Sequence, residues 1–409
     1  MAVSLGITRF AYGLLLPPMR TDLGWSYLLA GAMNTANAVG DLAGALSVPA
    51  LMRRWGAATV LQAGMTLAGL LMAATGWLRD DTVLLMQRAL AGVVSAWVFV
   101  AGGLLAAHLG TRWGAHAGLL LGVYYGGVGS GIVLSALVVP VALAAAGQRP
   151  HAWSGAWWAL GVVCLLATMG VRRASRAVNA VQAPPPAPAR GQAEPGVGGS
   201  SPVSTYAPPV SVPKPTEPPL PEASRVPWRA LVPALVGYAL FGVGYIGYMT
   251  FVIALLRERG ATAGEITRFY TLLGLAVMAS SRLWARLLDR YRDGRPLARL
   301  NALLALATAL PTLTPAWPVV LASGVLFGAV FLSVVASTTA WVRHNLPLAQ
   351  WASGISAFTI VFAAGQIVGP TVVGWIGDGP GGLERGLTWS AAALGLGAVV
   401  ARRQRALAG

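Results

Sequence analysis

The sequence is poor in charged residues and has almost no cysteine or lysine. Of its 409 residues only 10% are charged, 56% are hydrophobic, and the mean hydropathy is +0.65. About a quarter of the residues in a soluble domain are normally charged, so a soluble globule is excluded. The single cysteine, Cys164, excludes an intrachain disulfide and a site built from several thiolates.

Catalytic and nucleotide-binding patterns are also missing. The four histidines are scattered without metal-binding spacing. The only lysine is Lys214 in a proline-rich segment, so there is no Gly-Lys-Ser/Thr loop for a nucleotide. Neither Ser130 nor Ser356 lies in a Gly-x-Ser-x-Gly nucleophile turn, because Val128 stands two residues before Ser130 and Phe358 two residues after Ser356. We therefore expect no enzyme, no cofactor and no bound metal.

Long apolar stretches dominate the rest of the chain. A helix needs about 20 residues to cross about 30 Å of hydrocarbon, and only helices or closed barrels satisfy their backbone there. The stretches lack the alternation of barrel strands. The sequence thus predicts an all-α, polytopic membrane protein with twelve transmembrane helices, at residues 2–19, 27–50, 57–78, 82–107, 116–145, 153–171, 229–256, 264–287, 297–313, 317–342, 351–377 and 385–401.

The chain divides into two matching parts. Residues 172–228 are rich in proline, serine and glycine, which predicts a disordered cytoplasmic linker. Six predicted helices precede it (1–171) and six follow it (229–409). The second helix of each part ends in a similar basic loop, LMRRWG at 51–56 and LLDRYRDGR at 287–295. Such duplication predicts two pseudo-symmetric six-helix bundles, a plan used by secondary transporters.

The excess of positive charge follows the predicted loops. The chain has 29 basic and 13 acidic residues, for a net charge of +16. With both termini in the cytoplasm, 19 basic residues lie on the cytoplasmic side, seven outside and three within spans. This asymmetry is typical of cytoplasmic loops. It predicts a multi-pass protein of the inner (plasma) membrane and accounts for the charge without nucleic acid.

Four local patterns are similar to motifs of one transporter family. Arg88 lies four residues before Gly92 on the fourth predicted helix, and the fifth is rich in glycine. The eleventh carries Gly365-Gln366-x-x-Gly369-Pro370, and Asp289-Arg290 precedes Gly294-Arg295. In this order the patterns resemble the major facilitator superfamily. The phrases GITRFAYGLLLPPMRTDLGW and MNTANAVGDLAGAL are similar to its YbfB/YjiJ-type branch.

The resemblance implies a secondary transporter that works by alternating access. It implies that Arg53, Arg54, Asp289 and Arg290 belong to loops that switch between conformations. The glycine motif slightly favours efflux, although Gly127 stands where antiporters usually have proline. The alternative is a channel, a sensor or a membrane enzyme without a recognisable catalytic motif.

Ionisable residues inside a span are costly, so they are candidates for function. Asn34, Asn37 and Asp41 recur at a spacing that places them on one face of a helix. They fit either a proton-titrating carboxylate flanked by amides or polar contacts between helices. Depth along the helices, at 1.5 Å per residue, brings Asp41 within reach of Arg9 and not of Arg88. We therefore predict an Arg9–Asp41 pair.

Arg88 then has no acidic partner. It fits either hydrogen bonding to backbone carbonyls or a cation facing a cavity, where it would bind an anionic solute. We assign proton coupling to Asp41, Arg88 and Arg9. We expect a small organic solute, and because bases outnumber acids within the spans, an anionic or carboxylate-bearing solute is a candidate. We also expect a monomer in the lipid bilayer. The candidates for the solute cavity are Tyr12, Asn34, Asn37, Tyr124, Tyr245, Tyr248 and Gln366.

Overall fold

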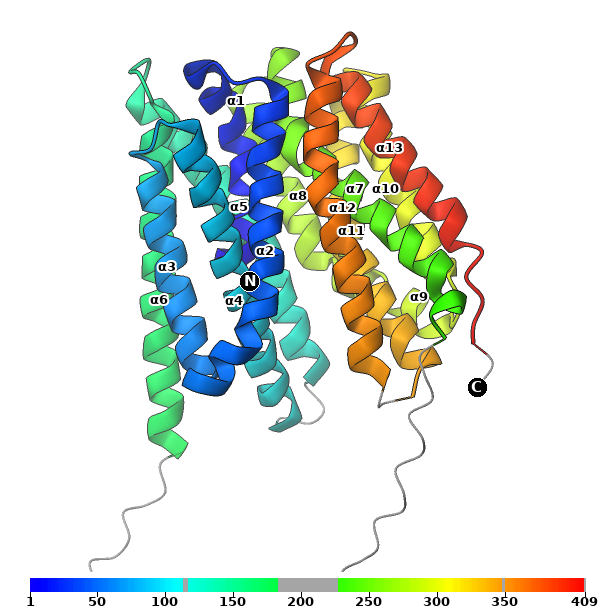
Figure 1. Ribbon diagram of the computed structural model, residues 1–409. Helices are drawn as coiled ribbons and strands as arrows, with labels where there is room; N and C mark the ends of the chain where they lie inside the picture. Colours follow the sequence, from blue (N-terminus) through cyan, green and yellow to red (C-terminus); the bar gives the residue numbers. More distant parts are fainter. Residues whose placement is uncertain (113–116, 183–226, 348–349, 408–409) are drawn as a thin grey trace, which may run out of the picture. The chain divides into compact units, whose positions relative to one another are not determined.

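The regular elements of the described residues are all helices (Figure 1). The computed structural model describes residues 1–112, 117–182, 227–347 and 350–407. The first half contains η1 (Ala2–Ile7), α1 (Ala11–Leu23), α2 (Tyr27–Trp55), α3 (Ala57–Thr75), α4 (Asp81–Arg112), α5 (Ala117–Ala146) and α6 (Trp153–Gln182). The second half contains α7 (Trp228–Glu258), α8 (Ala263–Leu283), α9 (Ala285–Arg290), α10 (Arg295–Leu313), α11 (Trp317–Asn345), α12 (Trp351–Gly377) and α13 (Gly382–Ala401).

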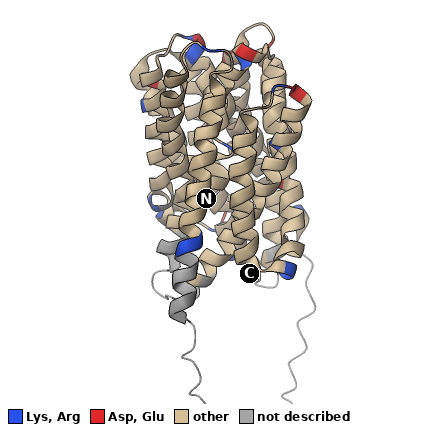
Figure 2. Ribbon diagram, turned by 90° about the vertical axis from the view of Figure 1, so that its left-hand side faces the viewer, with Lys and Arg blue, Asp and Glu red and all other residues tan. Residues whose placement is uncertain are grey.

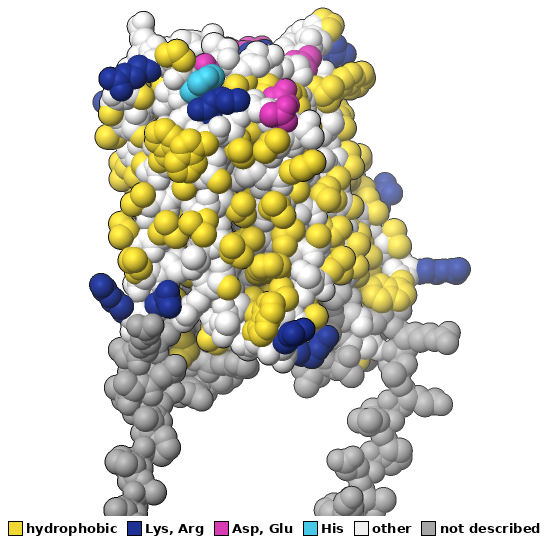
Figure 3. All heavy atoms as spheres, turned by 60° about the vertical axis from the view of Figure 1, so that its left-hand side comes forward, with side chains coloured by type: hydrophobic (Ala, Val, Ile, Leu, Met, Phe, Trp, Pro, Cys, Tyr) yellow, Lys and Arg dark blue, Asp and Glu magenta, His cyan; other side chains and the backbone are white. Residues whose placement is uncertain are grey.

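Charged residues concentrate near the two ends of the helices. Figure 2 shows most Lys, Arg, Asp and Glu residues at these ends, and Figure 3 shows hydrophobic side chains over the middle of one face. In the described part of the chain, eight helices are long and apolar enough to cross a membrane, namely α3, α4, α5, α6, α7, α10, α11 and α12. Of the others, α1 has only 13 residues and α2 carries Asn34, Asn37 and Asp41.

Three pairs of helices join the two halves. α2 packs against α12, α5 against α8, and α1 against α7. The α5–α8 contact depends on glycine, since a Cβ atom at Gly129 would lie 2.3 Å from the carbonyl oxygen of Gly274. The glycines on the fifth predicted helix therefore allow close packing between the halves.

The α2–α12 contact closes the bundle at what we call the Tyr27 end. The backbone N–H groups of Tyr27 and Leu28 donate to the carboxylate of Asp378, just after α12, at 2.7 and 2.8 Å. Ser26 accepts from Leu29 N–H at 3.1 Å. Helix α2 thus receives part of its N-terminal cap from the other half of the protein, and a carboxylate at this position also interacts favourably with the helix dipole.

The prediction of one continuous helix over 2–19 is wrong. The chain forms the π-helix η1, turns at Thr8–Phe10, and continues as α1. At the break, two backbone carbonyls accept hydrogen bonds from side chains. Arg88 donates to the oxygen of Thr8 at 3.2 Å, and Tyr270 donates to that of Phe10 at 2.7 Å. Irregular backbone inside a membrane protein needs such partners, which come from helices far away in the sequence.

Two other predicted boundaries differ. The helix predicted at 264–287 ends at Leu283 and is followed by the short helix α9 after Trp284, whose indole donates to the oxygen of Ala329 at 2.8 Å. Helix α6 continues to Gln182, into the segment 172–228 that was predicted as a linker, because its Ala, Val and Arg residues are compatible with a helix. The rest of that segment, 183–226, lies outside the described residues.

Candidate functional site

A buried cluster of polar side chains lies at mid-depth, where the halves meet. Arg9 donates one guanidinium nitrogen to the carboxylate of Asp41 and the other to the amide oxygen of Gln366. Tyr245 donates to the same oxygen of Gln366 at 2.8 Å. The predicted Arg9–Asp41 ion pair is therefore present, and Arg9 also connects the first half to α12 of the second half.

The cluster is closed to solvent around Arg9 but less so around Asp41. The side chain of Arg9 is 4% exposed and that of Asp41 is 19% exposed. Gln366 and Tyr245 are also buried. The carboxylate of Asp41 therefore keeps part of its surface outside the packed protein, whereas the guanidinium of Arg9 is enclosed.

Arg88 forms the second part of the cluster and forms no ion pair with a carboxylate within the described residues. It donates to the carbonyl of Thr8 and, at 3.3 Å, to the side-chain oxygen of Asn34. Its guanidinium lies 4.8 Å from the ring centre of Tyr12, a cation–π distance. Asn34 in turn donates to the hydroxyl of Thr250 on α7 at 2.6 Å. Arg88 is thus linked to the second half through Asn34.

The cluster retains unused hydrogen-bonding capacity. Among the described residues, the Nε atoms of Arg9 and Arg88 and the side-chain oxygen of Asn37 are buried without a hydrogen-bond partner. The amide nitrogen of Asn37 donates to the backbone oxygen of Arg88 at 3.1 Å. The interpretation of Asn37 as a contact between helices therefore agrees with its observed bond.

Not every predicted cavity residue belongs to this cluster. Tyr248 is hydrogen bonded to Ser323 at 2.6 Å, within the second half. Tyr124 donates to the carbonyl of Phe99 on α4 at 2.9 Å. Tyr12 contacts Arg88 with its ring, and its hydroxyl donates to the oxygen of Ala30 at 2.9 Å. The structure thus brings Tyr12, Asn34, Asn37, Tyr245 and Gln366 to the charged residues, and leaves Tyr124 and Tyr248 in separate networks.

The four residues of the predicted switch loops lie at the opposite end from Tyr27. Arg53 and Arg54 end α2, and Asp289 and Arg290 end α9. In the part of the chain that the structure describes, none of these four takes part in an ion pair.

Thr8 and Thr250 also belong to the cluster, although no sequence pattern pointed to them. Thr250 also donates to the carbonyl of Ile246 on its own helix, at 2.6 Å. Most threonines in membrane helices make only such local bonds. Nothing in its local sequence therefore distinguishes it, and its neighbour Asn34 is 216 positions away.

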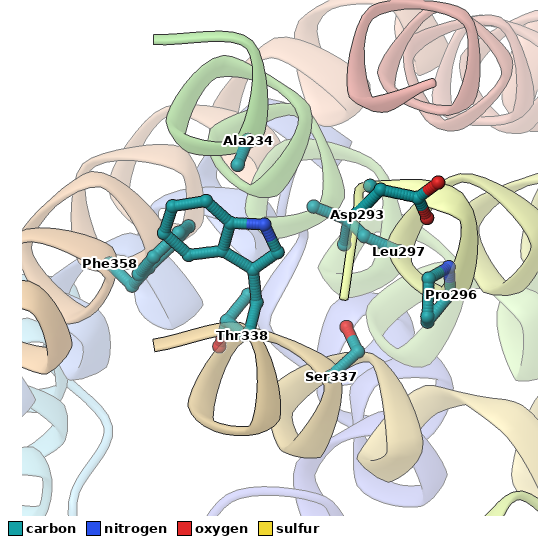
Figure 4. A pocket seen from close by; sticks show the side chains of 9 residues that line it. Ala234, Asp293, Pro296, Leu297, Ser337, Thr338 and Phe358 are labelled. Atoms are coloured by element: carbon teal, nitrogen blue, oxygen red, sulfur yellow. The ribbon is translucent and has the colours of Figure 1, made fainter. Parts of the chain in front are cut away.

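Within the second half, one small cavity lies between α7, α10, α11 and α12 (Figure 4). Its volume of about 10 Å³ leaves room for about one water molecule. Ser337 and Thr338 line it together with Trp341, whose buried indole N–H has no partner among the described residues. A water molecule fits this site, whereas an organic solute does not. No group of three potential metal ligands occurs within the described residues.

Comparison with known proteins gives the same fold. A family model described as "Uncharacterised MFS-type transporter YbfB" matches residues 1–199 and 202–402. The chain belongs to this family of major facilitator superfamily transporters. No curated protein matches its sequence.

Two solved structures have the fold of this YbfB-type transporter. One is a bacterial homologue of the human lysosomal transporter Spinster in an inward-facing, unoccupied conformation, with 13% identity, a TM-score of 0.64, and coverage of 98% of this chain and 95% of the other. The second is a mutant of the nucleoside transporter NupG, with 11% identity, a TM-score of 0.64, and 98% coverage of both chains. The prediction of an all-helical polytopic membrane transporter, and not an enzyme, is confirmed.

Proposed function

We propose that this protein is a proton-coupled secondary transporter of a small anionic organic solute. Two bundles, 1–171 and 229–409, joined by the linker 172–228, would move against each other by alternating access. The observation that carries the proposal is the position of Arg9, which bonds to both Asp41 and Gln366 across the two halves. The distribution of basic residues supports an inner-membrane protein with both termini in the cytoplasm.

The charges of the cluster support an anionic solute. Two guanidinium groups, Arg9 and Arg88, are matched by the single carboxylate of Asp41. When Asp41 takes up a proton, its attraction for Arg9 falls and the guanidinium becomes available. A carboxylate of the solute can then replace Asp41, because Arg binds carboxylates through two parallel hydrogen bonds. Proton and solute would therefore bind together.

The same exchange would drive the conformational change. The Arg9–Gln366 and Asn34–Thr250 hydrogen bonds both cross between the halves. A solute that binds Arg9 competes with Gln366 and so weakens the contact that holds this conformation. A ligand shifts such an equilibrium only through a difference in its contacts with the two states, and the shared guanidinium supplies that difference.

In the present conformation the α2–α12 contact supports closure at the Tyr27 end. It extends from Tyr27 and Leu28, which bond to Asp378, to Thr35, whose hydroxyl donates to the oxygen of Ile367 at 2.7 Å. We infer that the solute reaches Arg9 from the opposite end, the cytoplasmic end in the proposed orientation.

Transport by purified protein in proteoliposomes tests this function. A panel of carboxylates and neutral solutes of similar size would be supplied under an imposed pH gradient. We expect saturable, gradient-driven flux of a carboxylate by the wild type, and loss of the pH dependence in Asp41→Asn. Asp80→Asn is the matched control, because Asp80 is an exposed helix cap and asparagine caps a helix about as well.

Several outcomes of this experiment would argue against the proposal. Flux that does not saturate indicates a channel, and absence of flux for every solute with folded protein contradicts a transporter of this class of solute. Reversing the pH gradient decides direction. The glycine motif favours efflux, whereas exchange at Arg9 favours movement of proton and anion in the same direction. Asp41→Asn protein with an unchanged pH dependence would remove Asp41 from the mechanism.

A further inference from the structure

A larger cavity lies apart from the buried cluster, between α10, α13 and the segment after α13. Its volume is about 900 Å³. Arg295 and Arg299 of α10 and Arg402 and Arg405 after α13 line it. All four arginines are exposed. This cavity is far larger than one water molecule and is rimmed by positive charge.

The positive charge of this cavity is poorly compensated. In the part of the chain that the structure describes, Asp293 is the one acidic residue that lines it, and it pairs with Arg295 at 3.1 Å. Arg299 lies 4.8 Å from the ring centre of Tyr291. A hydrogen bond with Arg299, together with its charge, lowers the pKa of Tyr291 below the usual range. Arg402 and Arg405 take part in no ion pair within the described residues.

The segment that carries Arg402 and Arg405 is held in place. The side-chain oxygen of Gln404 accepts the backbone N–H of Ala234 at 3.1 Å, and its backbone oxygen accepts that of Gly294 at 3.0 Å. Gln404 itself is 3% exposed. The backbone on both sides of Gln404, which carries these arginines, is thus held beside α10.

An apolar strip continues from the cavity along the same two helices. Ala302 and Val399 belong to its lining. One turn farther along α10 lies Leu306, 49% exposed, and one turn back along α13 lies Leu396, 55% exposed. Helices α10 and α13 pack against each other. The surface therefore has arginines at the helix ends and exposed aliphatic side chains toward the middle of the bundle.

We propose that this cavity binds the headgroup of an anionic phospholipid. Arginine pairs with a phosphate through two hydrogen bonds, and basic pockets between transmembrane helices suit such headgroups. The acyl chains would lie along Leu306 and Leu396. The apolar strip beside the arginines favours a lipid over a soluble anion, because only a lipid has acyl chains that can contact it. The proposal depends only on the chain spanning a bilayer, and not on the solute or on proton coupling.

Thermal unfolding of the purified protein in detergent tests the proposal. The probes are the anionic lipids phosphatidylglycerol and cardiolipin. Phosphatidylcholine, which has no net charge, is the lipid control, and glycerol phosphate is the soluble anionic control. We expect both anionic lipids to stabilise the wild type more than phosphatidylcholine does. In Arg299→Gln/Arg402→Gln the lipid concentration for half-maximal stabilisation should rise about tenfold or more, because two phosphate ligands are lost.

The matched control is Arg172→Gln/Arg173→Gln, which removes two exposed charges of α6 and should bind the lipid like the wild type. If the first double variant does not fold, Arg299→Lys/Arg402→Lys keeps the charge but loses the paired hydrogen bonds, and should bind more weakly than the wild type. Equal stabilisation by phosphatidylcholine, equal stabilisation by glycerol phosphate, or an equal loss in the α6 control would overturn the proposal.

Discussion

The two halves of the molecule meet at mid-depth with different kinds of side chain. The first half contributes the charged residues Arg9, Asp41 and Arg88. The second half contributes stacked aromatic rings. On α7, the ring of Tyr245 lies at 7° to that of Phe331 of α11. The two halves therefore differ in the chemistry of the side chains that they contribute where they meet.

The aromatic stack extends along the second half for several residues. Phe241 stacks on Phe362 of α12 with an angle of 13° between the rings, and Tyr238 stacks on the same Phe362 at 23°. All of these rings except that of Phe362 belong to the buried class. Stacked rings pack in a defined geometry and add stabilisation beyond their buried area. Through Tyr245 and Gln366 this stack is connected to the charged residues of the first half.

This difference suggests a division of roles under the proposed mechanism. The carboxylate of Asp41 can gain or lose a proton, whereas the aromatic rings keep one state. Gln366 connects the two regions, because its amide oxygen accepts from both Arg9 and Tyr245. We therefore expect changes in the first half to alter both coupling and stability, and changes in the second half to alter stability alone.

The largest effect is expected from breaking the ion pair. Arg9→Gln leaves the carboxylate of Asp41 without its cation. Removing one partner of a buried pair typically costs about 3–5 kcal/mol, and partial exposure of Asp41 favours the lower value. Arg9→Gln/Asp41→Asn should recover most of this loss, because no unpaired charge remains. The free energy of unfolding in detergent measures both. Arg268→Gln, at an exposed arginine of α8, controls for loss of a positive charge.

An Arg9→Gln/Asp41→Asn variant as unstable as Arg9→Gln alone would show that the arginine acts through packing and not through charge. The contrast between a charged half and an aromatic half would then lose its energetic basis.

A smaller effect is expected in the aromatic half. Tyr245→Leu removes ring contacts with Phe241, Phe331 and Phe362, and aromatic pairs contribute about 0.5–1.5 kcal/mol each. We expect a loss of about 2 kcal/mol of unfolding free energy. Tyr245→Phe keeps the ring contacts and loses only the hydrogen bond to Gln366, so we expect it to lower the unfolding free energy by about 1 kcal/mol. Neither variant should change the pH dependence of transport. A changed pH dependence in Tyr245→Phe would extend the titrating unit into the second half.

The partner of Asp41 was predictable from the sequence, because it depends on how deep each charged residue lies along its helix. A buried charge needs a partner at its own depth, and counting residues along each helix pointed from Asp41 to Arg9. Gln366 and Tyr245 are hydrogen bonded to each other beside Arg9, whereas their place in a solute cavity stays a prediction. Helix positions were also predictable, because apolar length determines which segments can cross.

Contacts between distant helices were not predictable in this way. The break at Thr8–Phe10 depends on Arg88 and Tyr270 bonding to its backbone carbonyls, and no local residue signals it. The cap of α2 by Asp378 joins residues 350 or more positions apart. A single sequence gives the depth of each residue but not which helices are neighbours, so these partners emerge only from the fold.

The last effect, smaller than those expected for Arg9→Gln and Tyr245→Leu, concerns the closure at the Tyr27 end, where α2 and α12 also pack backbone against backbone. A Cβ atom at Gly31 would lie 2.2 Å from the backbone oxygen of Pro370, so Gly31→Ala should separate α2 from α12. We expect the population open at this end to rise about tenfold, equivalent to about 1.4 kcal/mol. Distances between spin labels at Thr21 and Leu313, one in each half, measure it. Gly155→Ala makes the same change in open space and should leave the distances unaltered. Unchanged distances in Gly31→Ala would mean that closure at this end tolerates the added methyl group, and that other contacts between the halves maintain it.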